Sequence, residues 1–173
     1  MIRSSSIAIQ GWKRPALLAL LGCMCLSVGL LVYLADRRPS AAPLVPAIAA
    51  LGGRNVFGAL GQWLPSFAHP LAFSLFTAAA LRPGMAACWG ACAFWGGVNV
   101  AFEVGQHPAL ASAWSAALHG GAGDWAIARH LVNYFLRGTF DPYDLCAATL
   151  GALAGGGLLQ CTHHFRQRRR DCQ

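Results

Sequence analysis

The sequence predicts an all-α, polytopic membrane protein with about four transmembrane helices and one short outer amphipathic helix. Two observations lead to this fold class. Hydrophobic residues make up 56% of the 173 residues and charged residues only 11%, too few to cover a water-soluble domain. Four segments also lack any charged side chain over roughly 20 residues, the length with which a helix crosses a hydrocarbon core about 30 Å thick.

The first span is expected over Pro15–Ala35, because proline suits the first turn of a helix. A cleaved signal peptide is the alternative, but its apolar core is shorter, about 7–15 residues. The sequence Asp36-Arg37-Arg38 that follows is also a poor cleavage context. We therefore expect a retained span, with residues 1–14 as a cytoplasmic N-terminal segment.

The second and third spans are expected over Ser66–Leu81 and Gly84–Glu103, separated by a tight turn at Arg82-Pro83-Gly84. Small residues in the third span allow another helix to approach closely. The preceding segment, Pro39–Pro65, is rich in proline, alanine and glycine. We expect a loop there, with one or two short helical pieces at the membrane interface.

The segment Gly105–Thr139 is expected to be a long outer loop that contains an amphipathic helix from Trp125 to Leu136. Asp124 is a suitable N-cap for this helix. Apolar residues recur in it with the helical period, and polar residues occupy the other side. Such a helix would lie on the membrane surface or cover the outer mouth of the bundle.

The fourth span is expected over Leu145–Thr162, after the sequence Asp141-Pro142-Tyr143-Asp144. Asp141 can cap this helix, and Asp144 would face the positive end of its dipole. Gly151 and Gly155 form a Gly-x-x-x-Gly face for packing against another span. The four-helix transmembrane domain would then cover residues 15–162, followed by a basic cytoplasmic tail at 163–173.

The distribution of charge predicts the orientation of the chain. Four spans place both termini on one side, which carries eight Lys and Arg residues against five on the other. The eight are Arg3, Lys13, Arg14, Arg82, Arg166, Arg168, Arg169 and Arg170. The positive-inside rule then predicts cytoplasmic termini in a multi-pass protein of the bacterial inner (plasma) membrane, with nearly all acidic residues outside. The net charge of +7 lies at the ends of apolar runs, so we expect the lipid bilayer, and no nucleic acid, as its partner.

Six of the seven cysteines lie inside or at the edge of the apolar spans, where cysteine behaves as a small hydrophobic residue. They are Cys23, Cys25, Cys88, Cys92, Cys146 and Cys161. Cys88 and Cys92 share a helix face, but no further ligand follows at metal-binding spacing. We therefore expect packing, with no metal and no cofactor; a metal or redox site is the alternative.

The polar groups that border the spans are the candidates for function. Because consecutive spans run in opposite directions, five of these groups should lie at the outer membrane level and converge. They are His69, Glu103, Gln106, Asp141 and Asp144. Asn99 lies one turn deeper than Glu103 on the same face.

These motifs, in this order, resemble the VanZ-like family of small integral membrane proteins. His69 opens one span, Glu103-x-x-Gln106 closes the next, and Asp141-x-x-Asp144 precedes a Gly-x-x-x-Gly span. The resemblance covers about residues 64–160. It implies a membrane protein of the cell envelope; the family is named after a factor in low-level glycopeptide-antibiotic resistance, and most of its members have no assigned reaction.

The sequence departs from the family pattern at three places. Gly138 stands where the family usually has arginine, with Arg137 one position earlier. Ala148 stands where asparagine is usual, and Ser66 and Phe67 precede the histidine where a charged residue is common. These departures concern the fine chemistry of the site and not the architecture.

Each candidate also has a structural interpretation. His69 can be an interfacial hydrogen-bonding residue, Asp141 and Asp144 can be helix caps, and Glu103 can pair with Arg129 or Arg137. As a functional site, they would bind an envelope glycan, a lipid-linked precursor or a cationic group in an accessory role. The substrate-binding candidates are His69, Glu103, Gln106, Arg137, Asp141 and Asp144.

A membrane enzyme is the alternative function. Glu103 or an aspartate would act as the general base on a lipid-linked or envelope substrate, while Arg137 would hold an anionic headgroup. A transporter or channel subunit is disfavoured, because the sequence has neither an internal repeat nor a charge in the middle of a span. The sequence does not predict an oligomeric state.

Overall fold

The computed structural model describes residues 4–36, 56–82, 84–121 and 126–171, and within these ranges it contains helices and no strand. The helices are α1 (Ser4–Asp36), α3 (Leu60–Leu81), α4 (Met85–Gly105), α5 (Pro108–Gly121), α6 (Ala126–Arg137) and α7 (Pro142–Asp171). Four of them, α1, α3, α4 and α7, are long and apolar enough to cross a membrane. The predicted all-α, polytopic fold is therefore confirmed.

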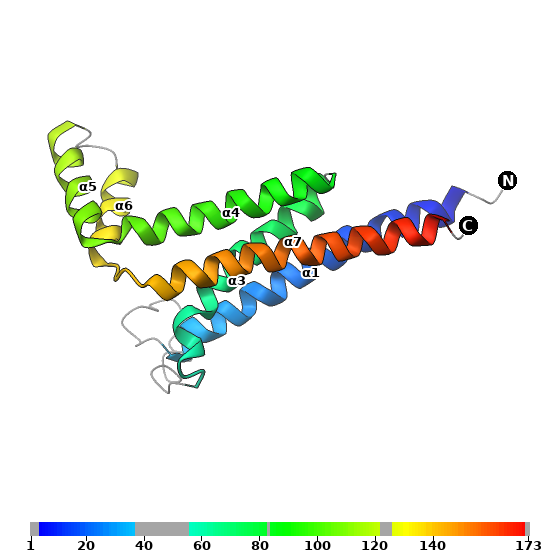
Figure 1. The fold of residues 1–173 in the computed structure, drawn as a ribbon, viewed down its shortest axis with the longest axis horizontal. Helices are drawn as coiled ribbons and strands as arrows, with labels where there is room; N and C mark the ends of the chain where they lie inside the picture. The colour runs from blue at the N-terminus through cyan, green and yellow to red at the C-terminus, as the bar shows by residue number, and fades with distance from the viewer. Residues whose placement is uncertain (1–3, 37–55, 83, 122–125, 172–173) are drawn as a thin grey trace.

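The four long helices form an antiparallel bundle around α3 (Figure 1). Helix α3 packs against α1, α4 and α7, and α4 also packs against α7. The beginning of α1 and the end of α7 lie at the same end of the bundle (Figure 1). We call the opposite end the distal end; it carries the end of α4, the packed pair α5 and α6, and the beginning of α7 (Figure 1).

Helix α3 begins at Leu60, six residues earlier than the predicted span. The segment Pro39–Pro65 was expected to be a loop with one or two short helical pieces; residues 60–65 are helical but continue into the span, and residues 39–55 lie outside the described part of the chain. Pro65 and Pro70 both lie inside α3; Pro70 also lies inside the predicted span, whereas Pro65 was expected to end the preceding segment. Membrane-spanning helices tolerate proline because neighbouring helices and hydroxyl side chains satisfy the freed backbone groups.

The region between the third and fourth spans is more helical than predicted. Helix α6 agrees with the amphipathic helix expected from Trp125 to Leu136, whereas its predicted cap, Asp124, lies outside the described residues. Helix α5 was expected to be loop. Proline at its first position and its many alanines favour a helix, but it lacks the amphipathic period that would have revealed it. Residues 163–171, expected as a basic tail, continue α7.

The core of the bundle is built from small and medium-sized side chains. Leu18, Leu75 and Leu159 are buried together with Cys88 and Cys92, so both cysteines pack in the core. Large apolar residues such as Leu30, Leu31 and Phe94 are instead exposed on the outside of the helices. In a membrane these side chains face lipid.

Helices α3 and α7 approach each other closely at glycines. Gly151 and Gly155 are both buried. A Cβ atom at Gly151 would collide with the backbone carbonyl oxygen of Phe67 in α3, and one at Gly155 would lie 3.4 Å from Cβ of Ser74. The Gly-x-x-x-Gly face therefore packs against the central helix of the bundle.

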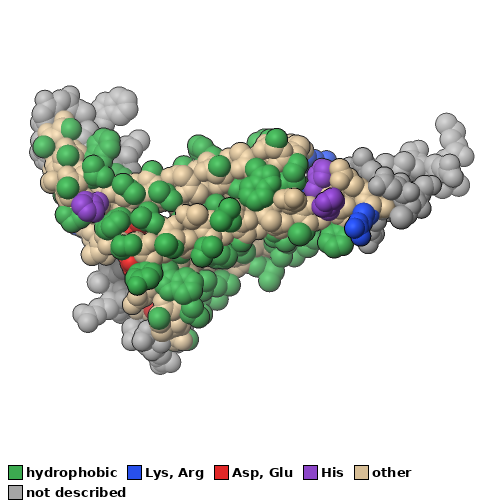
Figure 2. Space-filling model, viewed as in Figure 1, with side chains coloured by type: hydrophobic (Ala, Val, Ile, Leu, Met, Phe, Trp, Pro, Cys, Tyr) green, Lys and Arg blue, Asp and Glu red, His purple; other side chains and the backbone are tan. Residues whose placement is uncertain are grey.

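Acidic side chains gather at the distal end of the bundle, which also carries Arg137 at the end of α6. In Figure 2, Lys and Arg side chains lie near the end that carries the termini, and Asp and Glu side chains lie at the distal end. Glu103, Asp141 and Asp144 lie at the ends of the helices that meet there, on α4 and at the start of α7.

Candidate functional site

Glu103 is the buried acidic residue at the distal end of α4, and only 9% of it is exposed. Its Oε1 atom accepts a hydrogen bond of 2.7 Å from the backbone N–H of Asp141, the residue before α7. A carboxylate is costly to bury unless it is hydrogen-bonded, and this contact supplies such a bond. It also ties the end of α4 to the beginning of α7.

Two further carboxylates lie near Glu103. Asp141 and Asp144 both interact electrostatically with it. The Oδ1 atom of Asp141 accepts a hydrogen bond of 2.9 Å from the backbone N–H of Tyr143, as a cap at the start of a helix does. We call Glu103, Asp141 and Asp144 the carboxylate cluster. Asp141 has the capping role that was considered for the aspartates, and the three carboxylates also lie near one another.

Gln106 follows α4 and connects it to α6. Its Nε2 atom donates a hydrogen bond of 3.2 Å to the hydroxyl oxygen of Tyr134. A Cβ atom at Gly138 would collide with the Gln106 amide. The glycine that departs from the VanZ-like pattern is therefore the residue that leaves room for Gln106.

Arg137 is the last residue of α6, and its side chain is exposed. One structural interpretation was an ion pair between Glu103 and Arg137. The hydrogen bond to the Glu103 carboxylate comes instead from the backbone N–H of Asp141. The side chain of Arg129, the other predicted partner, lies outside the described part of the chain.

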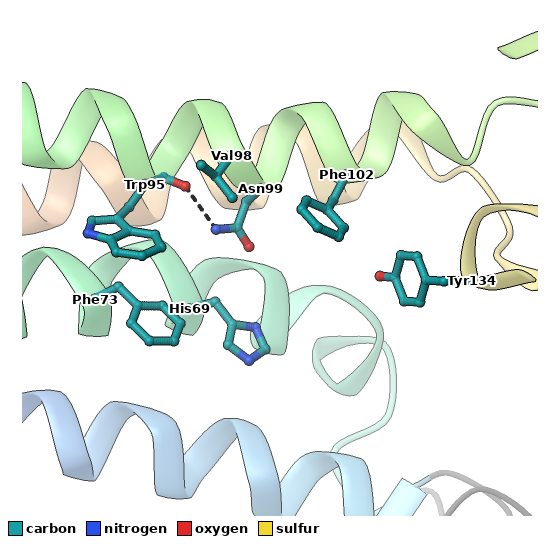
Figure 3. Close-up of a pocket in the computed structure, with 7 residues that line it drawn as sticks. All are labelled: His69, Phe73, Trp95, Val98, Asn99, Phe102 and Tyr134. Atoms are coloured by element: carbon teal, nitrogen blue, oxygen red, sulfur yellow. Dashed lines mark hydrogen bonds between the residues drawn. The ribbon is translucent and has the colours of Figure 1, made fainter. Parts of the chain in front are cut away.

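His69 lines a pocket whose described lining residues include no member of the carboxylate cluster. It lies on α3 and stacks on Phe73, with ring centroids 6.3 Å apart and planes 12° apart. The pocket, of about 260 Å³, lies between α3, α4 and α6. The described residues lining this pocket are His69, Phe73, Trp95, Val98, Asn99, Phe102 and Tyr134 (Figure 3).

Three helices contribute one polar group each to this pocket. They are the His69 ring from α3, the Asn99 amide from α4 and the Tyr134 hydroxyl from α6 (Figure 3). The Nδ2 atom of Asn99 donates a hydrogen bond of 2.8 Å to the carbonyl of Trp95, while its amide oxygen points toward the pocket (Figure 3). Tyr134 also accepts the hydrogen bond from Gln106, which links the pocket to the junction of α4 and α6.

The aromatic wall of the pocket is fixed by hydrogen bonds and ring contacts. Trp95 donates its ring N–H to the Thr77 hydroxyl at 2.9 Å, and its ring stacks on Phe73 with centroids 4.8 Å apart. Phe102 lies edge-on to Tyr134, with centroids 5.8 Å apart. Because the one polar atom of Trp95 is already bonded, this side chain offers the pocket an apolar face.

Sequence reasoning identified His69 and noted Asn99, but it missed the other lining residues. A signal was present: Trp95, Asn99 and Phe102 recur at helical spacing on α4, and His69 and Phe73 do so on α3. The same spacing also describes ordinary packing between helices. These residues line a pocket only because the faces of α3 and α4 that carry them are turned toward each other.

No set of three or more His, Cys, Asp and Glu side chains suited to a metal ion occurs in the described ranges. Cys88 and Cys92 are buried in the core, which agrees with packing. The distal end offers carboxylates, amides, aromatic rings, the Arg137 guanidinium and more than one imidazole, including those of His69 and His107.

Comparison with known proteins adds no relative from which a role could be read. No protein-family model matches the chain, and neither the curated proteins nor the solved structures contain a match.

Proposed function

We propose that this chain is a VanZ-like protein of the bacterial inner membrane that binds a component of the cell envelope at its distal end. Its role would be accessory, altering envelope assembly or the access of glycopeptide antibiotics. One observation carries the proposal: Glu103, Asp141 and Asp144 come together from helices distant in sequence, beside a pocket with converging polar groups. Scarce ionisable groups at a membrane edge mark functional sites.

The charges support an outward-facing distal end. Arg14 on α1, Arg82 directly after α3 and Arg168 on α7 lie at the terminal end of the bundle. The carboxylate cluster lies at the opposite end, with Arg137 as the described arginine there. Basic residues favour the cytoplasmic side. The proposed ligand therefore comes from outside the cell or from the outer leaflet.

The geometry favours binding over catalysis. A general base must lie within hydrogen-bonding reach of the proton that it removes. No carboxylate is among the described residues that line the pocket, and Oε1 of Glu103 already accepts the Asp141 N–H. The carboxylates therefore influence the electrostatic potential near the pocket but do not line it.

The test removes charge and keeps shape. Glu103→Gln retains an oxygen that can accept the Asp141 N–H, and Asp141→Asn can still cap α7. Asp36→Asn is the matched control: Asp36 ends α1 at the distal end and accepts the backbone N–H of Val56 at 2.7 Å, outside the carboxylate cluster.

Each variant is expressed in a susceptible bacterium, and the minimum inhibitory concentration of a glycopeptide antibiotic is measured together with the amount of protein in the membrane. We expect Glu103→Gln and Asp141→Asn to lose the resistance that the unmodified chain confers, at unchanged protein amounts, whereas Asp36→Asn keeps it. Unchanged resistance in both cluster variants would overturn the proposal. So would loss of the protein from the membrane in both, which would leave the cluster with a structural role only.

A further inference from the structure

We infer that the pocket between α3, α4 and α6 binds the organic ammonium group of an envelope ligand. This inference rests on the proposed function and deepens it by naming the chemical class of the ligand. Three features of the pocket carry it: its size, its aromatic lining and the sign of the charge beside it.

The size of the pocket limits what can enter. Pockets for drug-sized molecules measure about 300–1,000 Å³. At about 260 Å³, this pocket accepts one small headgroup and not a complete lipid or a disaccharide. A trimethylammonium group or a primary ammonium with its first carbons fits within such a volume.

The lining supplies aromatic faces and hydrogen-bond acceptors. Phe73, Trp95, Phe102 and Tyr134 are aromatic, and they come from three helices (Figure 3). Aromatic rings attract organic cations through their negative faces. The Asn99 oxygen, directed into the same space, can accept a hydrogen bond from an N–H donor (Figure 3).

The charge beside the pocket selects a cation. Glu103 directly follows the lining residue Phe102 on α4, and it interacts electrostatically with Asp141 and Asp144. No lysine or arginine is among the described lining residues. Negative charge near a site favours ligands of positive charge, and Arg137, three residues after Tyr134 at the end of α6, is a nearby basic residue along that helix.

The experiment compares two probes of the same shape and different charge, choline and 3,3-dimethylbutan-1-ol. The full chain is purified in an uncharged maltoside detergent, with every tryptophan except Trp95 replaced by phenylalanine. Trp95 fluorescence then reports occupancy of the pocket. Isobutyrate, an anion of similar size, is the third probe.

We expect choline to bind about tenfold more tightly than the neutral alcohol, which corresponds to about 1.4 kcal/mol and lies within the range of cation–π interactions. Phe102→Leu, which removes an aromatic face from the pocket, and Glu103→Gln, which removes charge, should each bring the ratio toward one. Phe165→Leu, an exposed phenylalanine of α7 outside the pocket, should leave it unchanged.

Equal affinity for choline and the alcohol, tighter binding of isobutyrate, or no binding of any probe would overturn the inference. The proposed function is judged separately, by the resistance of Glu103→Gln and Asp141→Asn cells. If those variants lose resistance while choline fails to bind selectively, the ammonium inference is wrong and the binding role of the distal end stands. If they keep resistance, the proposed function fails whatever the probes do.

Discussion

The packing of α7 on α3 predicts different effects for two glycine-to-alanine substitutions on one helix. A Cβ atom at Gly151 would collide with the carbonyl oxygen of Phe67 and lie 3.1 Å from the Pro70 ring. The backbone of α3 cannot turn aside as the end of a flexible side chain can. At Gly157, further along α7, a Cβ atom would meet nothing within 4 Å.

The magnitude follows from two terms. Alanine stabilises a helix interior relative to glycine by about 1 kcal/mol, and this gain is common to both positions. Overpacking a close contact costs about 1–3 kcal/mol, and it applies to Gly151 alone. Gly157→Ala should therefore raise the free energy of unfolding. The free energy of unfolding of Gly151→Ala should be lower than that of Gly157→Ala by about 1–3 kcal/mol.

Both variants can be measured by unfolding the purified protein with sodium dodecyl sulfate in mixed micelles, with the loss of helical circular dichroism as the signal. The unmodified protein is the reference. If Gly151→Ala is as stable as Gly157→Ala, or more stable, then α3 and α7 do not pack through this face, and the arrangement of the bundle described above is wrong.

Three further substitutions test local contacts by the same unfolding titration. Glu103→Leu leaves the Asp141 N–H without its acceptor and should lower the free energy of unfolding by about 1–3 kcal/mol, whereas Glu103→Gln keeps an acceptor. Equal stability of the two variants would contradict the hydrogen bond between α4 and the start of α7. Thr77→Val removes the acceptor of the Trp95 N–H and should lower the free energy of unfolding by about 1 kcal/mol. In a variant whose single tryptophan is Trp95, the fluorescence emission should also shift, and an unchanged spectrum would argue against this hydrogen bond. Gly58→Ala should cost about 1 kcal/mol through backbone conformation alone, because Gly58 has φ of 54° with open space around it; a gain in stability would contradict this.

The four spans could be predicted because length and freedom from charge suffice to identify them. Helix α6 could be predicted from its amphipathic period. The beginning of α3 could not, since Pro65 ends a segment rich in proline and glycine and proline disfavours a helix interior. Helix α3 packs against α1 and α7, and no local pattern contains this packing.

Part of the candidate site could likewise be predicted from the sequence, and part could not. Glu103 and Asp141 could be placed together because the ends of antiparallel neighbours lie at one level. The position of His69 in an aromatic pocket could not be predicted, because it depends on how α3 is rotated about its axis. Each residue turns a helix by about 100°, so the level of a side chain in the membrane does not fix the neighbour that it faces.

Labelling of single cysteines in intact cells is the most direct test of the central claim, a four-span bundle with its polar site outside and its termini in the cytoplasm. On a cysteine-free background, Thr139→Cys reports the distal end and Arg168→Cys the end of α7; both positions are exposed. We predict that a membrane-impermeant maleimide labels Thr139→Cys in intact cells and Arg168→Cys only after permeabilisation. Labelling of both from the same side, or the reverse pattern, would contradict the account.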